Sequence, residues 1–525
     1  MIKLNNKNTS LLIHLLLPVL PLINIFVKNF YILSSDEKYY LYLIAILIYI
    51  VGYFFHRVQS KSNFKVTKYY LIWIFLFFNY FSITNYAFNN FPPVLTGIGN
   101  YAFYFYILIF LTTTYFFKVF YEKEFFENLL KIFIVLSIFT SSYYLFSEIL
   151  KTSSNQVDTV TNENVNFKIS PDVYFIIFDN MANFKILNEY YNYDTSELSG
   201  NLLDNNHFVY ENSTSLYGQT RLSMSSILNL EYLFPEGDVP FSTRQQIVNK
   251  FLTTDSIVYS TFEKNNYELF IVGENFPCDN NRHNCINYKV NDGFLYNLLI
   301  NTPYSILVNN RSSIPSLYKA INKLLKIDCS PDCKEITFNE ILSNIKKLDD
   351  PSRPNLVLIH NNNAHKPFRL DENCDNLENT KFEPAILNKK EYIDANKCNV
   401  NELIYLSSNI NTRSIIIAQS DHGPRYINST EIFSNLNEDD IKNKYTIFAS
   451  TYGLDKLCEN ANNTIFYGVN TFRALFNCLS QETSYEYLPI KSFYASYGTQ
   501  LGQINYGFNE IIDITEKLDE LISSR

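Results

Sequence analysis

Acidic and imidazole side chains stand at the ends of two apolar runs in this sequence. The run that starts at Asp172 ends in Asp179, and the run that starts at Ser414 leads into Asp421, His422 and a glycine. Carboxylates and imidazoles are ligands of divalent transition metals. Either aspartate alone would more often be a solvated strand end or a helix cap. An Asp-His pair after one run and a matching Asp after another favour a metal site built from all three.

A hydroxyl group lies between these two runs, at the start of a helix-like segment. The polar string Asn212-Ser-Thr-Ser-Leu-Tyr-Gly-Gln leads to Thr220, and a helical pattern continues over Leu222–Leu230. A hydroxyl at a helix N-terminus meets free backbone N–H groups and the positive end of the helix dipole, which favour an anion such as phosphate. A bound metal would also lower the pKa of the hydroxyl and make it a nucleophile. The residues alone leave two interpretations open, because Thr220 could equally be only a helix cap.

The elements that must position these residues are predicted to be strands of one sheet. A continuous run of β-branched and aromatic residues is typical of a strand that is buried on both faces of a parallel sheet. In such sheets the functional residues lie just beyond the carboxyl ends of the strands, which would bring the two runs' ligands together. Further strands are predicted over Tyr267–Val272, Asn355–His360 and Tyr445–Ala449, and helices over Leu222–Leu230, Tyr304–Leu325 and Thr337–Leu348. This alternation predicts an α/β fold with a mainly parallel central sheet.

The composition divides the chain into parts. With 525 residues it is too long for one ordinary domain, and the apolar composition of the first 150 residues gives way to a polar one. We expect a transmembrane domain over residues 1–150, a linker over 151–168 and an extracytoplasmic catalytic domain over 169–525. The net charge of −9 excludes a dedicated nucleic-acid binder, which would need a basic excess.

Five apolar segments are long enough to cross a bilayer as helices, which takes about 20 residues each. They run over Ser10–Phe30, Tyr39–Phe55, Tyr69–Phe88, Ala102–Phe120 and Leu129–Leu150. Basic residues precede the first segment and occur in the loop between the second and third, whereas the loop around Asn89–Asn100 has none. The positive-inside rule therefore predicts a cytoplasmic N-terminus, and five spans would put the rest of the chain on the opposite side.

The cysteines agree with this topology. All eight follow the proposed membrane domain, as expected for disulfides in an oxidising compartment. The simplest pairing joins sequence neighbours, namely Cys278 with Cys285, Cys329 with Cys333, Cys374 with Cys398, and Cys458 with Cys478. A structural zinc site is the alternative, but the paired short knuckles of such a site are missing.

Several of these strings together resemble a known family. Pro171–Asp179, Tyr217–Asn229, His365-Lys-Pro-Phe368 and Ser420–Gly423 resemble the sulfatase-like branch of the alkaline phosphatase superfamily. With five preceding spans, the chain further resembles lipoteichoic acid synthases and lipopolysaccharide phosphoethanolamine transferases. The resemblance implies that Thr220 is the nucleophile and that Asp179, Thr220, Asp421 and His422 hold a divalent metal, Zn or Mn.

The resemblance also suggests roles for neighbouring residues, and it has limits. It implies that His365 contacts phosphate or transfers a proton, and Arg221 and His360 are further candidates on the substrate side. The transferases usually have Glu at the position of Asp179, and sulfatases commonly have a second acid where this chain has Asn180. The Cys/Ser-x-Pro-x-Arg string of true sulfatases is absent around Thr220, which argues against sulfate ester hydrolysis.

The function that the resemblance implies is head-group transfer in a cell envelope. The enzyme would move phosphoethanolamine or phosphoglycerol from a phospholipid donor to an envelope glycan, which could be lipopolysaccharide, O-antigen or capsule, through a phospho-threonine intermediate. It would lie in a bacterial inner membrane with its catalytic domain in the periplasm. Two alternatives remain open, a phosphate ester or phosphodiester hydrolase and a non-catalytic membrane scaffold.

Overall fold

The structure is a computed structural model, and it describes most of the chain after residue 164. The described ranges are 165–234, 252–273, 276–279, 281–286, 337–348, 352–377, 385–424, 433–458, 464–498 and 507–523, with a few positions between 46 and 139. The chain divides into two compact units, and nearly all described residues belong to the unit formed by Val160–Val290, Cys333–Gly498 and Gly507–Arg525. The five predicted spans lie almost entirely outside the described residues, as do most of the linker and the predicted helix over Tyr304–Leu325. Within the described ranges, no helix has the length and apolar character that a bilayer crossing requires.

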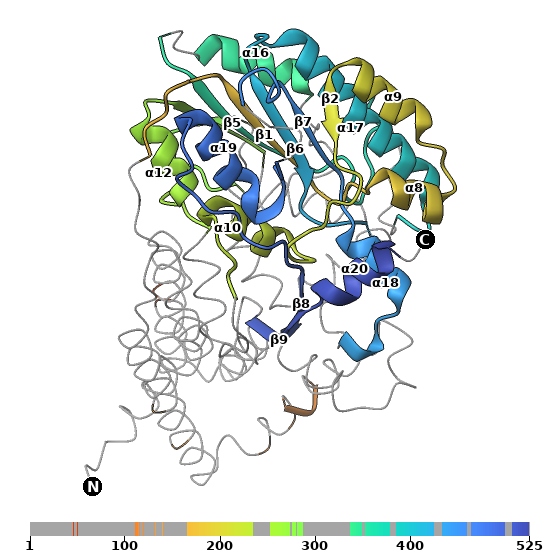
Figure 1. Ribbon diagram of the computed structural model, residues 1–525. Coiled ribbons are helices and arrows are strands. Elements are labelled where there is room, and N and C mark those ends of the chain that lie inside the picture. Colours follow the sequence, from red (N-terminus) through yellow and green to blue (C-terminus); the bar gives the residue numbers. More distant parts are fainter. Residues whose placement is uncertain are drawn as a thin grey trace, which may run out of the picture. The chain divides into compact units, whose positions relative to one another are not determined.

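A seven-stranded sheet forms the centre of this unit, in the order β2-β7-β6-β1-β5-β3-β4 (Figure 1). Its strands are β1 (Val173–Phe178), β2 (His207–Val209), β3 (Glu268–Val272), β4 (Asn284–Ile286), β5 (Asn355–Asn361), β6 (Ile415–Ser420) and β7 (Ala449–Tyr452). Strands β6, β1, β5, β3 and β4 are parallel to one another, whereas β7 is antiparallel to both β6 and β2. The α/β fold with a mainly parallel sheet is therefore confirmed.

Helices cover both faces of the sheet (Figure 1). They are α8 (Phe184–Tyr191), α9 (Ser196–Asp204), α10 (Thr220–Asn229), α12 (Ile257–Lys264), α16 (Phe338–Leu348), α17 (Lys389–Asn409) and α19 (Thr471–Ser480). The central strand β1 is buried throughout. Phe175 and Ile177 pack in one core with residues of α10, α12 and α19, and Ile176 and Phe178 pack in the other with residues of α8, α9, α16 and α17. Burial on both faces explains why β1 has no polar alternation.

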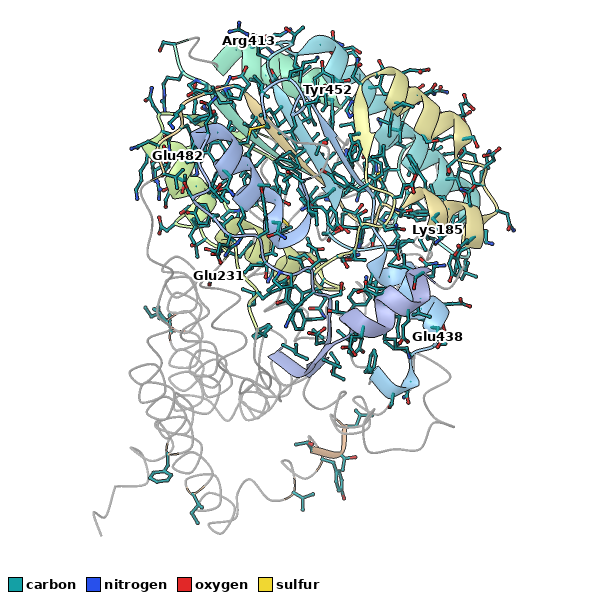
Figure 2. The ribbon with its side chains drawn as sticks, viewed as in Figure 1. Lys185, Glu231, Arg413, Glu438, Tyr452 and Glu482 are labelled. Carbon is teal, nitrogen blue, oxygen red and sulfur yellow. A yellow bond between two sulfur atoms is a disulfide. The ribbon has the colours of Figure 1, made fainter. Side chains whose placement is uncertain are left out.

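A smaller layer adjoins the start of α10. It consists of the hairpin β8 (Phe493–Gly498) and β9 (Gly507–Asp513), with α18 (Glu438–Tyr445) and α20 (Thr515–Ser523). Apolar residues of α18 and α20 share a core with Tyr494 of β8. Charged side chains such as Arg413, Glu438 and Glu482 are exposed, and Figure 2 shows them around the outside of the unit.

Three disulfides join the predicted cysteine pairs. They are Cys278–Cys285, Cys374–Cys398 and Cys458–Cys478. Cys329 and Cys333 lie outside the described residues. Sequence neighbours therefore pair wherever the structure describes them, as expected for a domain that folds in an oxidising compartment.

One predicted strand is misplaced. The sequence predicts a strand over Tyr445–Ala449, but Tyr445 ends helix α18 and β7 begins only at Ala449. Asn437 caps α18 by accepting a hydrogen bond from the Asp440 backbone N–H, and acidic residues fill the first turn, which stabilises the helix start. Thr446 and Ile447 instead form isolated bridges to the loops at Thr214 and Ala182.

Candidate metal centre and nucleophile

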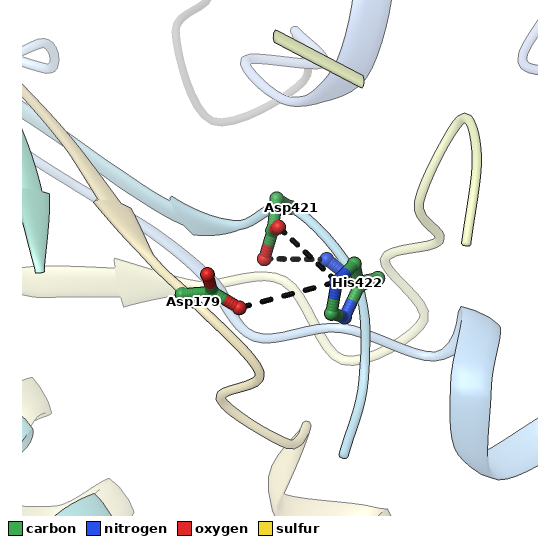
Figure 3. Close-up of side chains that lie close together, drawn as sticks. All are labelled: Asp179, Asp421 and His422. Atoms are coloured by element: carbon green, nitrogen blue, oxygen red, sulfur yellow. Dashed lines mark hydrogen bonds and ion pairs between the residues drawn. The ribbon is translucent and has the colours of Figure 1, made fainter. Parts of the chain in front are cut away.

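The carboxyl ends of β1 and β6 bring the predicted ligands together. These strands pair in parallel with Phe178 opposite Ser420, so Asp179 and Asp421 leave the sheet side by side. One ligand atom from each of Asp179, Asp421 and His422 lies within 4.8 Å of the others (Figure 3). We call these three residues the Asp179 cluster. The structure thus brings together, at one edge of the sheet, three side chains from two runs that are far apart in the sequence.

The two carboxylates of the Asp179 cluster are buried and incompletely hydrogen-bonded. Asp421 Oδ1 accepts hydrogen bonds from the backbone N–H groups of His422 at 2.8 Å and Asn180 at 3.3 Å. Among the described residues, neither Asp179 Oδ1 nor Asp421 Oδ2 has a hydrogen-bond partner. Buried polar atoms in proteins nearly always have a hydrogen-bonding or charged partner, so these two oxygens fit a bound cation.

The pKa shifts of Asp179 and Asp421 also indicate that this pair of carboxylates fits a cation. Burial and the charge of Asp421 raise the pKa of Asp179 well above its usual range. Burial acts in the same direction on Asp421, but His422, the Thr220 hydroxyl and other neighbours together lower the pKa of Asp421. The two carboxylates by themselves thus hold one negative charge in preference to two, and a divalent cation would let both ionise.

His422 presents the correct ring atom to the two carboxylates. Its Nε2 lies 3.4 Å from Asp421 Oδ2 and 3.9 Å from Asp179 Oδ1, while its Nδ1 lies 3.1 Å from the carbonyl oxygen of Gly423. Burial lowers the pKa of His422 to about 3, so the imidazole is neutral. In the tautomer whose Nδ1–H donates to that carbonyl oxygen, Nε2 is free to bind a metal, as is usual for a metal-ligating histidine. Two carboxylates and one neutral imidazole therefore fit a divalent cation such as Zn or Mn.

Gly423 is required for this arrangement by a close backbone approach. A Cβ at this position would lie 2.1 Å from the carbonyl oxygen of Asn443, and the Gly423 N–H donates to the carbonyl oxygen of Lys444 at 2.7 Å. Only glycine allows the Asp421-His422 turn to lie against the end of α18 at this distance. The glycine that follows Asp-His in the sequence thus has a structural reason.

Thr220 lies beside the Asp179 cluster at the first position of α10. Its hydroxyl is near enough to the Asp421 carboxylate to help lower the pKa of Asp421. Ser223 fixes this helix to the same turn, because its hydroxyl lies 3.0 Å from the carbonyl oxygen of Asp421 and 3.1 Å from that of Tyr217. The first N–H groups of α10 face this end, where an anion is favoured.

A strand of the smaller layer supports the turn before Thr220. Gln219 donates a side-chain hydrogen bond to the carbonyl oxygen of Ala495 in β8 at 2.9 Å. The backbone N–H of Phe493 donates to Leu216 at 2.7 Å, and the rings of Tyr217 and Phe493 stack at 5.5 Å between centroids. The turn is therefore held on both sides, by β8 and by the Asp421 loop.

The remaining predicted residues divide into two groups. His360, near the end of β5, lies with its Nε2 3.7 Å from Asp179 Oδ2, and burial lowers its pKa to about 4. His365 is near enough to Asp421 for the carboxylate to act on its pKa, although burial dominates and lowers that pKa. Arg221 is exposed on the first turn of α10, and no contact in the described part of the chain joins it to the Asp179 cluster.

Lys444 is the residue that the sequence did not reveal. Its Nζ lies 3.2 Å from His422 Nδ1. Burial lowers the pKa of Lys444 to about 8, and the charges of Asp421 and Asp179 partly oppose that shift. Gly218 makes room for it, because a Cβ there would lie 3.2 Å from Lys444 Cε. Nothing in the sequence distinguishes Lys444 from other lysines, since its neighbours are set by the packing of α18 against the Asp421 turn.

Comparison with known proteins gives structural neighbours only. No protein-family model and no curated sequence matches the chain. Similar solved structures include lipooligosaccharide phosphoethanolamine transferase A from Neisseria meningitidis, with 12% identity, 90% of this chain and 92% of that chain covered, and a TM-score of 0.38.

Two further neighbours cover a little over half of the chain. The zinc complex of the C-terminal periplasmic domain of EcEptC from Escherichia coli is 14% identical, covers 56% of this chain and 74% of that chain, and has a TM-score of 0.33. An alkaline phosphatase superfamily protein from Vibrio parahaemolyticus is 10% identical, covers 57% of this chain and 65% of that chain, and has a TM-score of 0.32. The structural neighbours are thus of the kind that the sequence resemblance named.

Proposed function

We propose that this protein is a metal-dependent transferase that moves a phospho-alcohol head group from a phospholipid to an envelope glycan through phospho-Thr220. One observation carries the proposal. The Thr220 hydroxyl stands at the N-terminus of α10, near a carboxylate of a buried cluster that fits a divalent cation. A hydroxyl so placed is suited to attack phosphorus, because both the helix end and the cation favour the charge that develops.

The cation site would be formed by Asp179, Asp421 and His422, with the Thr220 oxygen as a further ligand. A divalent cation bound there would lower the pKa of the hydroxyl and neutralise phosphate charge. The orphaned oxygens of the two buried aspartates support this assignment, since they need a positive partner.

The first half-reaction forms the bond between Thr220 Oγ and phosphorus. The bond between phosphorus and the glycerol oxygen of the lipid breaks, and diacylglycerol leaves with a proton. In the second half-reaction an acceptor hydroxyl attacks phospho-Thr220 and loses its proton, and the Thr220 oxygen is released. Such transfers depend chiefly on positioning and charge neutralisation.

His365 and Lys444 would serve these steps from the side of the cluster. His365 is held neutral by burial, so it can accept a proton from the acceptor hydroxyl and return one to a leaving oxygen. Lys444 supplies a cation that is near enough to Asp421 and Asp179 for their charges to act on its pKa, and it would help neutralise phosphate charge there. His360 is better placed to orient Asp179 than to touch substrate, because its Nε2 faces Asp179 Oδ2.

The location in a bacterial inner membrane with a periplasmic catalytic unit belongs to the same proposal. The three disulfides favour an oxidising compartment. The apolar first 150 residues would anchor the unit where a phospholipid donor is available. The acceptor would be a glycan of the same envelope.

The proposal is tested by trapping the intermediate. The full-length chain in detergent is incubated with phospholipid that carries a labelled head group, without glycan, and its peptides are analysed by mass spectrometry. We expect an adduct on Thr220 whose mass identifies phosphoethanolamine or phosphoglycerol. Thr220→Ala should lack it and lose transfer by about 10³-fold or more.

Ser225→Ala is the matched control, because Ser225 lies on the same helix within its buried part. It should keep both adduct and transfer. No adduct on Thr220 would contradict the proposal, and label released to water at the same rate with or without glycan would indicate a hydrolase.

A further inference from the structure

Helix α17 has a buried polar face directed at the loops that carry the site. Tyr392, Asn396 and Asn399 are spaced by four and three residues, which puts them on one side of the helix. All three side chains are fully buried. Burying polar groups costs free energy unless each finds a partner, so their partners show what this face does.

Tyr392 holds the loop that follows Asp179. Its hydroxyl donates to the carbonyl oxygen of Asn180 at 2.8 Å and accepts from the backbone N–H of Ala182 at 2.9 Å. Asn180 has a left-handed backbone with φ of 63°, so the chain turns sharply directly after Asp179. One side chain therefore satisfies both polar backbone groups across this turn.

The same turn is joined directly to the other aspartate. The N–H of Asn180 donates to Asp421 Oδ1 at 3.3 Å, while its carbonyl oxygen accepts from Tyr392. A second anchor is Ser420, whose hydroxyl donates to the carbonyl oxygen of Met181 at 2.7 Å. A shift of the turn would thus change the separation of Asp179 and Asp421.

The helix face also reaches the loop that carries His365. Asn363 donates to the side-chain oxygen of Asn399 at 3.1 Å, and the ring of Phe368 lies 5.6 Å from that of Tyr392, between centroids. The loop after β1 and the loop after β5 are therefore both packed on one helix, and the loop after β1 comes from a distant part of the sequence.

We propose that Tyr392 is a positioning residue that sets the spacing of Asp179 and Asp421 for one shared cation. This inference rests on the proposed function, because it takes the two aspartates as ligands of one cation. Tyr392 lies behind the Asn180 turn and acts through the backbone. Removing its hydroxyl leaves a buried N–H and a buried C=O without their partner and frees the turn.

The test measures Zn²⁺ affinity and stability on the full-length chain, purified in detergent and freed of metal. Tyr392→Phe should raise the Kd for Zn²⁺ about tenfold, the lower end of what a supporting partner of a metal ligand contributes. Tyr267→Phe is the matched control. Tyr267 is equally buried and donates to the carbonyl oxygen of Pro171 at 2.9 Å, at the opposite end of β1.

Both variants should lower the metal-free melting temperature by similar amounts, but only Tyr392→Phe should weaken Zn²⁺ binding. Equal Zn²⁺ affinities in the two variants would overturn the inference. If Tyr392→Phe does not fold, Ser420→Ala removes the second anchor of the same turn, and a wild-type Kd in that variant would overturn it too. A wild-type chain that binds no Zn²⁺ would instead contradict the proposed function itself.

Discussion

Two groups of histidine and carboxylate side chains in this protein differ in whether their carboxylates contact a cationic side chain. The Glu263 cluster consists of Asp255, Glu263, Arg282 and His283, next to the Cys278–Cys285 disulfide. Arg282 contacts Asp255 at 2.8 Å and Glu263 at 2.7 Å, and His283 Nε2 lies 3.1 Å from Glu263. The Asp179 cluster instead buries two carboxylates with one neutral imidazole, and two of the carboxylate oxygens have no hydrogen-bond partner among the described residues.

The comparison shows how a structural cluster differs from a binding site built of the same residue types. In the Glu263 cluster the guanidinium of Arg282 contacts both carboxylates, so each has a cationic partner within the protein. In the Asp179 cluster the like charges repel, and burial makes the repulsion costly. Proteins retain such unfavourable groups where function requires them. The unbalanced negative charge therefore marks the Asp179 cluster as a candidate metal site better than residue type does.

The largest expected contrast is between the two histidines. His422→Gln should weaken Zn²⁺ binding by more than about 100-fold, because losing a ligand costs more than losing its supporting partner. It should reduce head-group transfer correspondingly. His283→Gln should leave both unchanged, since Glu263 keeps Arg282. Calorimetric Zn²⁺ titration with the radiolabelled transfer assay measures both, and equal losses in the two variants would remove the distinction.

The next contrast is between Lys444, the cation beside the Asp179 cluster, and Arg282, the cation of the Glu263 cluster. Lys444→Met should lower the rate of transfer about 100-fold, as expected when one charge that stabilises a transition state is lost. Its Zn²⁺ affinity should change little, because Lys444 is not a proposed ligand. Arg282→Met removes a cation of similar reach and should leave transfer unaffected. A Lys444→Met enzyme with normal turnover at saturating Zn²⁺ would show that this lysine only supports the structure.

The smallest contrast is in the free energy of unfolding, which should change in opposite directions when a carboxylate of each cluster is neutralised. In metal-free protein at pH 8, Asp179→Asn should raise the free energy of unfolding by about 1 kcal/mol, while Glu263→Gln should lower it by up to about 1 kcal/mol. Asp179 destabilises the fold because its pKa is raised on folding, so the unfolded chain releases its proton more readily as the pH rises. Glu263 instead loses its contacts with Arg282 and His283.

The pH dependence gives this last test its control. The advantage of Asp179→Asn should shrink as the pH falls toward 3.8, the ordinary pKa of an aspartate, and added Zn²⁺ should reverse its sign. Chemical denaturation at several pH values measures the change. A variant that is less stable than wild type in metal-free protein at pH 8 would mean that Asp179 is satisfied without a cation.

The strands next to the site could be predicted because a strand that is buried on both faces needs a continuous run of apolar residues, and such runs are visible in the sequence. β1 and β6 lie within the predicted apolar runs, and β3 and β5 match their predictions to within one residue. The strand predicted over Tyr445–Ala449 is wrong because Tyr445 belongs to the last turn of α18, and Thr446 and Ile447 form only isolated bridges before β7 begins at Ala449. The five membrane spans, and the roles of Thr220, His365, Arg221 and His360, stay predictions.

By itself, the sequence determined which side chains could bind a cation and that two central strands would carry them to one sheet edge. It could do so because a strand buried on both faces needs an apolar run, and the residues after such runs share an edge when the strands are parallel. Only the tertiary structure decided that Lys444 approaches His422 and that Tyr392 holds the turn after Asp179. It also decided that one carboxylate oxygen each of Asp179 and Asp421 has no hydrogen-bond partner among the described residues. These features depend on how α17 and α18 pack against the strand ends, and contacts between segments so distant in the chain leave no local pattern.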